Sequence, residues 1–429
     1  MEPLREAPRR VLPTPTQLLP QPARVPAQSA PFTIPATLEG IISALYKPIT
    51  LAPLVKNEPS SMPSGTKSAH PFKGGSTIGH DRMEHLIQSA SMTQYKDTRN
   101  GLLGTDFSTK LSAWLALGCI TARQVHYYLV AFEDGTDGGK WKGIQGYGKG
   151  ENRGTAAVRF ELLWRDYMRL CTRKFGPQLF RLSGFRNDDS YPWKMPNKAH
   201  PELQETLTRF LNGTTGTGLI DASQRELFLT GYTSNRARQN VASYLSKHLG
   251  INWMLGAEWY ESLLVDYDVS SNWGNWQYVA GVGNDPRGEA RVFNPVKQAF
   301  DYDPEGEYIK AWVPELRGLD DPQKIFQAWK MNDEEKKERG LQGKDVVERP
   351  LKRIDFYVGR KGGGGGQYGG SSRNNRKHDQ VGENGRGRGG GSFGARGAYR
   401  GRGRGGEMGR GQGRQGMMDK VNWSQQHST

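Results

Sequence analysis

The chain has 429 residues, two cysteines and a formal net charge of +15. No apolar run approaches the roughly 20 residues that a membrane-spanning helix needs, so the sequence predicts a soluble protein without membrane contact. The proline-rich start lacks the apolar core of a secretory signal, and Cys119 and Cys171 lie in apolar segments with helical spacing. We therefore expect reduced thiols, no metal site and a location in the nucleus, cytoplasm or mitochondrion.

Composition divides the chain into four segments. Residues 1–70 are rich in Pro, Ser and Thr, which predicts a mostly irregular linker with at most one helix, over 38–46. Residues 71–325 show helical periodicity without alternating strand patterns, so we expect an all-α domain that is large enough to bury a cofactor. Residues 326–358 are charged and are interpreted as a second linker. Residues 359–429 are rich in Gly and Arg.

The last segment carries 14 Lys and Arg against 4 Asp and Glu, so it holds +10 of the net charge. It has too little apolar surface to offset chain entropy and is expected to be disordered. Its Arg-Gly repeats are interleaved with Phe393 and Tyr399. This pattern favours RNA or single-stranded DNA binding through phosphate contacts and stacking, with a solubilising extension as the alternative.

The stretch RFELLWRDYMRLCTRKFG predicts a helix with Phe160, Leu163, Tyr167 and Leu170 on its apolar face and a stop at the following Gly-Pro. On the opposite face, ELLWRDY offers an acid, an indole and a guanidinium that could line a pocket. An interfacial helix with an internal ion pair explains the same residues equally well.

In YKDTRNGLLGTDFSTKLSAWLALG, the residues Ser108, Thr109, Lys110 and Ser112 stand at the opening of an apolar helix. Hydroxyls, a Lys and free backbone N–H groups at a helix N-terminus can bind a pyrophosphate. Helix capping is the alternative interpretation.

In TSNRARQN, the spacing of Asn235, Arg238 and Gln239 places them on one helical face. Amides can make paired hydrogen bonds to a flavin or a base. The alternative is capping by the polar residues, with Arg238 in a structural ion pair to an acid such as Asp266.

The stretch DYDVSSNWGNWQY combines Asp266, Asp268, Asn272, Trp276 and Tyr278 within thirteen positions. The acids could accept hydrogen bonds from a ribityl chain, an adenine or an Arg, while the amide could meet a heterocycle. Indoles in helical proteins more often fill the core. Further tryptophans at 164, 193 and 253 favour a shared pocket.

Taken together, STKLSAWLALG, ELLWRDY, NRARQN, DYDVSSNWGNWQY and RVFNP resemble motifs of the photolyase/cryptochrome family. The stretch YKDTRNGLLG, together with Gln239 and Tyr278, is similar to its cryptochrome-DASH branch. The resemblance covers Pro71 to Leu319. It implies an all-helical domain that binds FAD in a U-shaped conformation.

The resemblance also implies roles for single residues. The implied cofactor contacts are Tyr95, Ser108, Thr109, Lys110, Leu111, Ser112, Arg165, Asn235, Arg238, Asp266, Asp268 and Asn272. The implied catalytic set is Asn272 beside the flavin N5 edge, Glu161 on the substrate, and an electron relay formed by Trp276, Trp253 and Trp193. The implied nucleic-acid contacts are Arg99, Glu161, Trp164, Arg236, Gln239, Tyr278, Arg291 and Gln298.

The implied reaction is light-driven splitting of cyclobutane pyrimidine dimers by an electron from reduced FAD. Single-stranded DNA is the expected substrate because Gln239 and Tyr278 occupy positions that distinguish the DASH branch from duplex-active relatives. The (6-4) branch would place a histidine at Asn235. No segment resembles the family's antenna domain, so the folate chromophore methenyltetrahydrofolate is not expected to bind. We expect a monomer; the rival hypotheses are a blue-light signalling flavoprotein and an RNA-binding protein.

Overall fold

The computed structural model describes residues 37–45, 62–197, 199–285 and 292–357, and the structural statements below concern these residues. They are helical, as the sequence predicts; the β-structure among them is one isolated parallel bridge between Lys194 and Ile251. No helix within these ranges has both the length and the apolar character to span a membrane.

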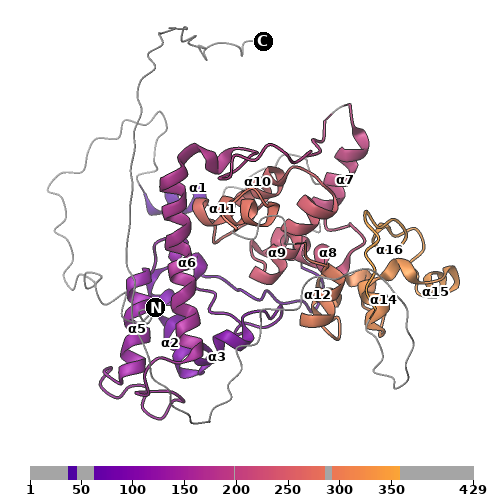
Figure 1. Cartoon of the computed structure of the whole chain (residues 1–429). Coiled ribbons are helices and arrows are strands. Elements are labelled where there is room, and N and C mark those ends of the chain that lie inside the picture. Colours follow the sequence, from indigo (N-terminus) through magenta and orange to yellow (C-terminus); the bar gives the residue numbers. More distant parts are fainter. Residues whose placement is uncertain (1–36, 46–61, 198, 286–291, 358–429) are drawn as a thin grey trace, which may run out of the picture. The chain divides into compact units, whose positions relative to one another are not determined.

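Figure 1 labels most of the helices along the chain. The α-helices are α1 (Leu38–Leu45), α2 (Ser76–Gln88), α3 (Ser91–Thr98), α4 (Ser112–Ala116), α5 (Ala122–Asp134), α6 (Arg153–Phe175), α7 (Pro201–Leu211), α8 (Gly218–Thr230), α9 (Asn235–Ser243), α10 (Trp253–Leu263), α11 (Val269–Ala280), α12 (Pro295–Tyr302), α13 (Glu307–Trp312), α14 (Pro322–Phe326), α15 (Asp333–Glu338) and α16 (Asp345–Glu348). Short 3₁₀ segments are η2 (Gly176–Phe180), η4 (Pro314–Leu316) and η5 (Ala328–Lys330), and η3 (Tyr244–His248) is a π-helical turn.

Helix α6 links two hydrophobic cores. Its N-terminal half contributes Val158 and Leu162 to a core with residues of α2, α3, α4 and α5, and Cys171 near its C-terminus belongs to a larger core built on α8 to α13. Along its length it packs against α3 and α5 and then against α11 (Figure 1). A capping box between Asn152 and Thr155 starts the helix, and the chain leaves it at Gly176.

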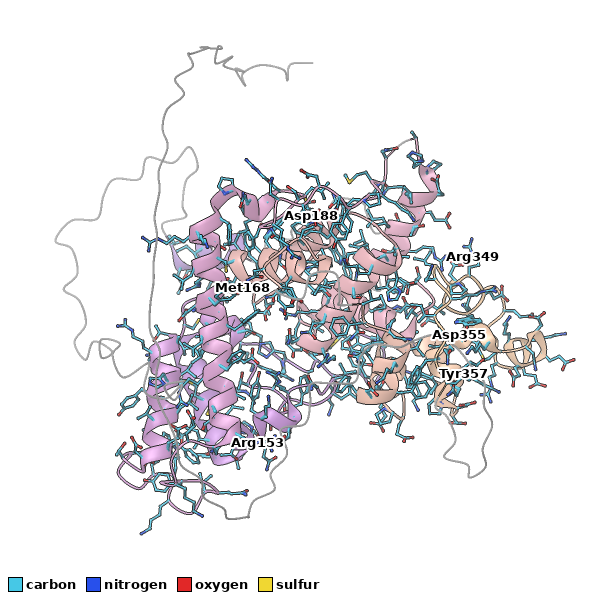
Figure 2. All side chains as sticks on the ribbon, viewed as in Figure 1. Arg153, Met168, Asp188, Arg349, Asp355 and Tyr357 are labelled. Carbon is cyan, nitrogen blue, oxygen red and sulfur yellow. The ribbon has the colours of Figure 1, made fainter. Side chains whose placement is uncertain are left out.

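The predicted apolar face of α6 is wrong. Phe160, Tyr167 and Leu170 are exposed, with 62% of Leu170 accessible. The helix instead buries the face that carries Val158, Leu162, Met168 and Cys171, and Met168 lies midway along it in Figure 2. The interior face also includes Arg159, which is buried because Glu133 and Glu151 neutralise it. Because a charged residue occupies an interior position, the spacing of apolar residues did not identify the buried face of α6.

Residues 326–357 are also not a linker. Phe326, Leu341, Val347 and Ile354 are buried in the larger core. The backbone N–H of Leu351 donates to the carbonyl of Thr215 at 2.8 Å, which ties this segment to the loop before α8. Its many charges are used in pairs, such as Lys330 with Asp355, whose side chain is labelled in Figure 2. The high density of charges made these core residues hard to recognise in the sequence.

The folded region begins earlier than residue 71. Ala69 and His70 are buried, and Thr66 Oγ1 donates to the carbonyl of Ala311 at 2.7 Å. The short apolar stretch expected to be helical forms α1, whose Leu38 and Ile42 are exposed. The Gly- and Arg-rich segment 359–429 lies outside the described residues.

Candidate functional site

A cavity of about 550 Å³ opens where the two cores meet. Leu111, Val158 and Leu162 of the smaller core line it together with Tyr260 and Trp276 of the larger one. The volume lies within the roughly 300–1,000 Å³ that small-molecule sites occupy. All of the residues expected to contact a cofactor line this cavity: Tyr95, Ser108, Thr109, Lys110, Leu111, Ser112, Arg165, Asn235, Arg238, Asp266, Asp268 and Asn272. So do six residues with other expected roles: Arg99, Glu161, Trp164, Gln239, Trp276 and Tyr278.

Asp266 places a negatively charged carboxylate in the wall of the cavity. Its Oδ2 accepts hydrogen bonds from Ser112 Oγ at 2.7 Å and from Arg238 Nη2 at 3.0 Å. Burial alone would raise the pKa of Asp266, but the Arg238 guanidinium outweighs it and lowers that pKa, so the carboxylate is ionised. Its Oδ1 is buried without a hydrogen-bond partner among the described residues. An unpaired carboxylate oxygen is costly, so this atom calls for a ligand donor.

Asp268 serves a different purpose from Asp266. Its Oδ1 accepts a hydrogen bond from the backbone N–H of Ser271 at 2.9 Å, which caps the N-terminus of α11. Its Oδ2 accepts from Arg169 Nη2 at 2.9 Å. Both oxygens therefore have protein partners, and the residue orients α11 along the cavity wall.

Helix α11 presents one face to the cavity. Asn272 and Trp276 are four residues apart and therefore lie one above the other on this face. Asn272 Nδ2 donates to the carbonyl of Ala257 on α10 at 2.9 Å, so its amide orientation is fixed and its Oδ1 remains as an acceptor. The helix ends at Gly281, whose φ of 90° favours glycine.

The loop before α4 supplies hydroxyls to the cavity. Ser108, Thr109 and Ser112 line the cavity, but Lys110 Nζ is bonded to the carbonyls of Ala69 and Gly104, neither of which lines it. Burial, with help from Arg82, lowers the pKa of Lys110 to about 7. Lys110 lines the cavity while these two hydrogen bonds hold its amino group to the surrounding backbone, so its contact with a pyrophosphate stays a prediction.

Arg165 on α6 supplies a cation that lines the cavity. Its Nη2 donates to the carbonyl of Leu115 at 3.3 Å, and its Nη1 lies 3.8 Å from Asp166 Oδ1. A guanidinium has five N–H donors, so these two contacts leave donors for a ligand. Burial lowers the pKa of Arg165, yet a guanidinium stays charged at neutral pH.

Acidic and aromatic side chains line another part of the cavity. Glu161 Oε1 lies 2.5 Å from Arg99 Nη1, and both side chains are about one-third exposed. The ring of Trp164 meets that of Tyr278 edge-on, with centroids 5.9 Å apart. This arrangement combines a carboxylate with two flanking rings within reach of solvent.

The three tryptophans expected to form a relay lie in or against the larger core. Trp276 lines the cavity, Trp253 at the start of α10 is fully buried, and Trp193 is half-buried. The bridge between Lys194 and Ile251 holds the segment of Trp193 against the start of α10. Trp253 and Trp193 do not line the cavity, and their role in a relay stays a prediction.

Arg236 and Gln298 also lie outside the cavity wall and pair with each other. Arg236 Nη1 donates to Gln298 Oε1 at 3.2 Å and to Gln239 Oε1 at 3.1 Å, while its Nη2 donates to Asn100 Oδ1 at 2.8 Å. Arg291, the last expected nucleic-acid contact, lies outside the described residues.

The cavity includes residues that sequence reasoning missed. Ser271, Asn275 and Val279 line it. They share the face of α11 with Asn272 and Trp276, so helical spacing from Asn272 could have identified them. Tyr260 on α10 is fully buried, lines the cavity and has a hydroxyl without a partner among the described residues. Nothing in the local sequence distinguishes it from a core aromatic.

Comparison with known proteins agrees with this geometry. Residues 158–354 match the FAD binding domain of DNA photolyase. A Neurospora crassa protein, named as a mitochondrial cryptochrome DASH, is 54% identical over 382 residues, which are 84% of this chain and 51% of that protein. The chain spans about half the length of the curated relatives it matches.

Two crystal structures share the fold. The cryptochrome of Synechocystis sp. PCC6803 superimposes with a TM-score of 0.58 at 42% identity, over 67% of this chain and 55% of that one. A bacterial class III photolyase from Agrobacterium tumefaciens gives a TM-score of 0.55 at 27% identity, over 66% of this chain and 54% of that one. The helical body is thus a photolyase-type FAD-binding domain. The chain belongs to the photolyase/cryptochrome family, and its similarity is to the cryptochrome-DASH branch.

Proposed function

We propose that the protein binds FAD in this cavity and uses it for light-driven repair of cyclobutane pyrimidine dimers, preferentially in single-stranded DNA. One observation supports the proposal. The same cavity is lined by Asn272 and Trp276, which are expected beside the flavin, and by Glu161, Trp164 and Tyr278, which are expected to contact the dimer.

The residues present fit FAD. Ser108, Thr109 and Ser112 offer hydroxyls, Arg165 offers a cation, and the unpaired Oδ1 of Asp266 offers an acceptor. These groups match phosphate oxygens and the N–H or O–H donors of an adenosine or ribityl part. When bound, FAD supplies the light-driven one-electron chemistry that opens the cyclobutane ring, with the electron returned afterwards.

The protein's own side chains would orient the reacting parts. Asn272 Nδ2 donates one of its two N–H groups to the carbonyl of Ala257, which orients the amide, and its Oδ1 would accept from an N–H donor on the ring that it faces. Glu161 would accept hydrogen bonds from the pyrimidine edges of a dimer. Trp164 and Tyr278 would flank the dimer and exclude water from it.

A single-stranded substrate suits this site energetically. A dimer must leave the base stack to reach the cavity, which costs a few kcal/mol from a duplex and much less from a single strand. Arg236 is already bound by Gln239, Gln298 and Asn100, so it would contact phosphates as one member of a polar cluster. The Arg- and Gly-rich segment 359–429 would add non-specific contacts to RNA or DNA.

The proposal is tested by adding FAD to the purified full chain and recording its absorption spectrum after removal of free flavin. The wild-type protein should retain flavin. The variant Asp266→Asn should retain much less, because Arg238 loses its buried charge partner. Asp301→Asn removes a surface pair with Lys297 and should behave as wild type. A wild-type chain that folds but stays colourless would refute FAD binding.

Repair is then measured on a short single strand with one dimer, under blue light with reduced flavin. Recovery of the intact pyrimidines is the expected result. A flavin-loaded protein that photoreduces but releases no repaired strand would favour the alternative, a blue-light signalling role.

A further inference from the structure

Arg99 and Glu161 bind each other in this structure, although each has an expected contact with nucleic acid. Arg99 follows the last residue of α3, Glu161 lies on α6, and their side chains approach to 2.5 Å. The Tyr95 hydroxyl lies within hydrogen-bonding reach of both, where burial and the Glu161 carboxylate raise its pKa. The phenol therefore stays protonated and can donate to Glu161.

The position of the pair connects it to the backbone-contacting cluster. Asn100, the residue after Arg99, accepts a hydrogen bond from Arg236 Nη2 at 2.8 Å. A strand that places a phosphate beside Arg236 therefore brings the next phosphates close to Arg99. Because the pair is about one-third exposed, its disruption is worth no more than about a fivefold change in affinity. A phosphate can thus compete for Arg99.

We propose that the Arg99–Glu161 ion pair is a charge gate that discriminates dimer-containing strands from undamaged ones; this inference rests on the proposed repair function. A phosphate that takes Arg99 leaves the Glu161 carboxylate without its cation. A flipped dimer compensates by presenting imide N–H donors to Glu161. An undamaged strand places no base in the cavity. When it binds, either the Glu161 carboxylate loses its partner or the phosphates of the strand lack a contact with Arg99.

The test measures binding in the dark, by fluorescence anisotropy at fixed salt, on a short single strand with and without one dimer. The proteins are the flavin-loaded full chain and its variants Glu161→Gln, Arg99→Gln and the double substitution. Asp97→Asn is the matched control, because Asp97 lies two residues before Arg99 but pairs at 3.7 Å with the exposed Arg153 instead.

Glu161→Gln should tighten binding of the undamaged strand by about two- to fivefold, because Arg99 becomes free for phosphate. It should also reduce the preference for the dimer. In the Arg99→Gln background the same substitution should change the affinity for the undamaged strand no more than Asp97→Asn does. Arg99→Lys keeps the charge and should preserve the dependence on Glu161.

Equal effects of Glu161→Gln with and without Arg99, or an effect no larger than that of Asp97→Asn, would overturn the gate while leaving the repair proposal intact. A flavin-loaded wild type that binds both strands equally would remove the repair proposal and the gate together.

Discussion

The indole of Trp276 lies directly against the backbone of Gly256. A Cβ atom added to Gly256 would stand 2.2 Å from Trp276 Cη2 and 2.8 Å from Leu245 Cδ2. The absence of a side chain on α10 therefore sets the position of the innermost indole of the expected relay.

The substitution Gly256→Ala should move that indole. We expect a loss of about 1–3 kcal/mol in the free energy of unfolding from overpacking, partly offset by the better helix propensity of Ala. Photoreduction of bound flavin should also slow. Gly74→Ala, which meets no atom within 4 Å, should leave both properties unchanged in denaturation and flash-photolysis measurements.

Trp276→Phe should slow photoreduction strongly. FAD retention should stay near the wild-type level, because the indole lines the cavity but forms no hydrogen bond with the buried carboxylate of Asp266. The control is Trp329→Phe, whose ring contacts Lys330 and Arg353 and does not line the cavity. An unchanged photoreduction rate in Trp276→Phe would remove this residue from the relay.

Glu226 should make stability depend on pH. It is fully buried on α8, its Oε2 accepts a hydrogen bond from Tyr308 Oη at 2.7 Å, and burial raises its pKa to about 7. The folded protein therefore keeps a proton that the unfolded chain releases above its ordinary pKa of about 4.3. Between these two values stability must fall as the pH rises.

Glu226→Gln is permanently neutral and removes this contribution. Relative to the variant, the free energy of unfolding of the wild type should fall by on the order of 2–3 kcal/mol between about pH 5 and pH 8. Chemical denaturation of the flavin-free proteins at both pH values measures the difference. Glu258→Gln, at an exposed position on α10, should show the wild-type pH dependence. Identical slopes for Glu226→Gln and wild type would show that Glu226 ionises within the fold.

Deletion of residues 359–429 removes a net charge of +10. Binding to long single strands should weaken, and its dependence on salt should become shallower because fewer counterions are released. Dimer cleavage on short oligonucleotides should persist, because the cavity lies within residues 95–279. A parallel loss of cleavage would give the segment a role in the reaction itself.

The sequence allowed the helical architecture and many members of the cavity to be predicted, because the family motifs mark segments that lie far apart in the chain and meet at one cavity. Asn235, Asp266 and Asn272 are far from Ser108 in the chain, yet all line one cavity. Ordered motifs of a known family carry this long-range information, whereas local periodicity does not.

The prediction from periodicity was wrong where a charged residue is buried or an apolar residue is exposed. Arg159 is buried because two carboxylates surround it, and Leu170 is exposed despite its apolar spacing. Lys110 lines the cavity, but its amino group donates to the backbone carbonyls of Ala69 and Gly104. Two of these partners, Glu133 and Ala69, lie 26 and 41 residues away in the chain, so a short window of the sequence does not contain them.

The single helix α6 enters both cores, through Val158 and Leu162 in one and Cys171 in the other. The two walls of the cavity therefore cannot part without bending a continuous 23-residue helix. The cavity is therefore formed before a ligand enters, so the protein loses little conformational entropy on binding. Rigidity of this kind favours photochemistry, which requires donor and acceptor to be in place before the photon arrives.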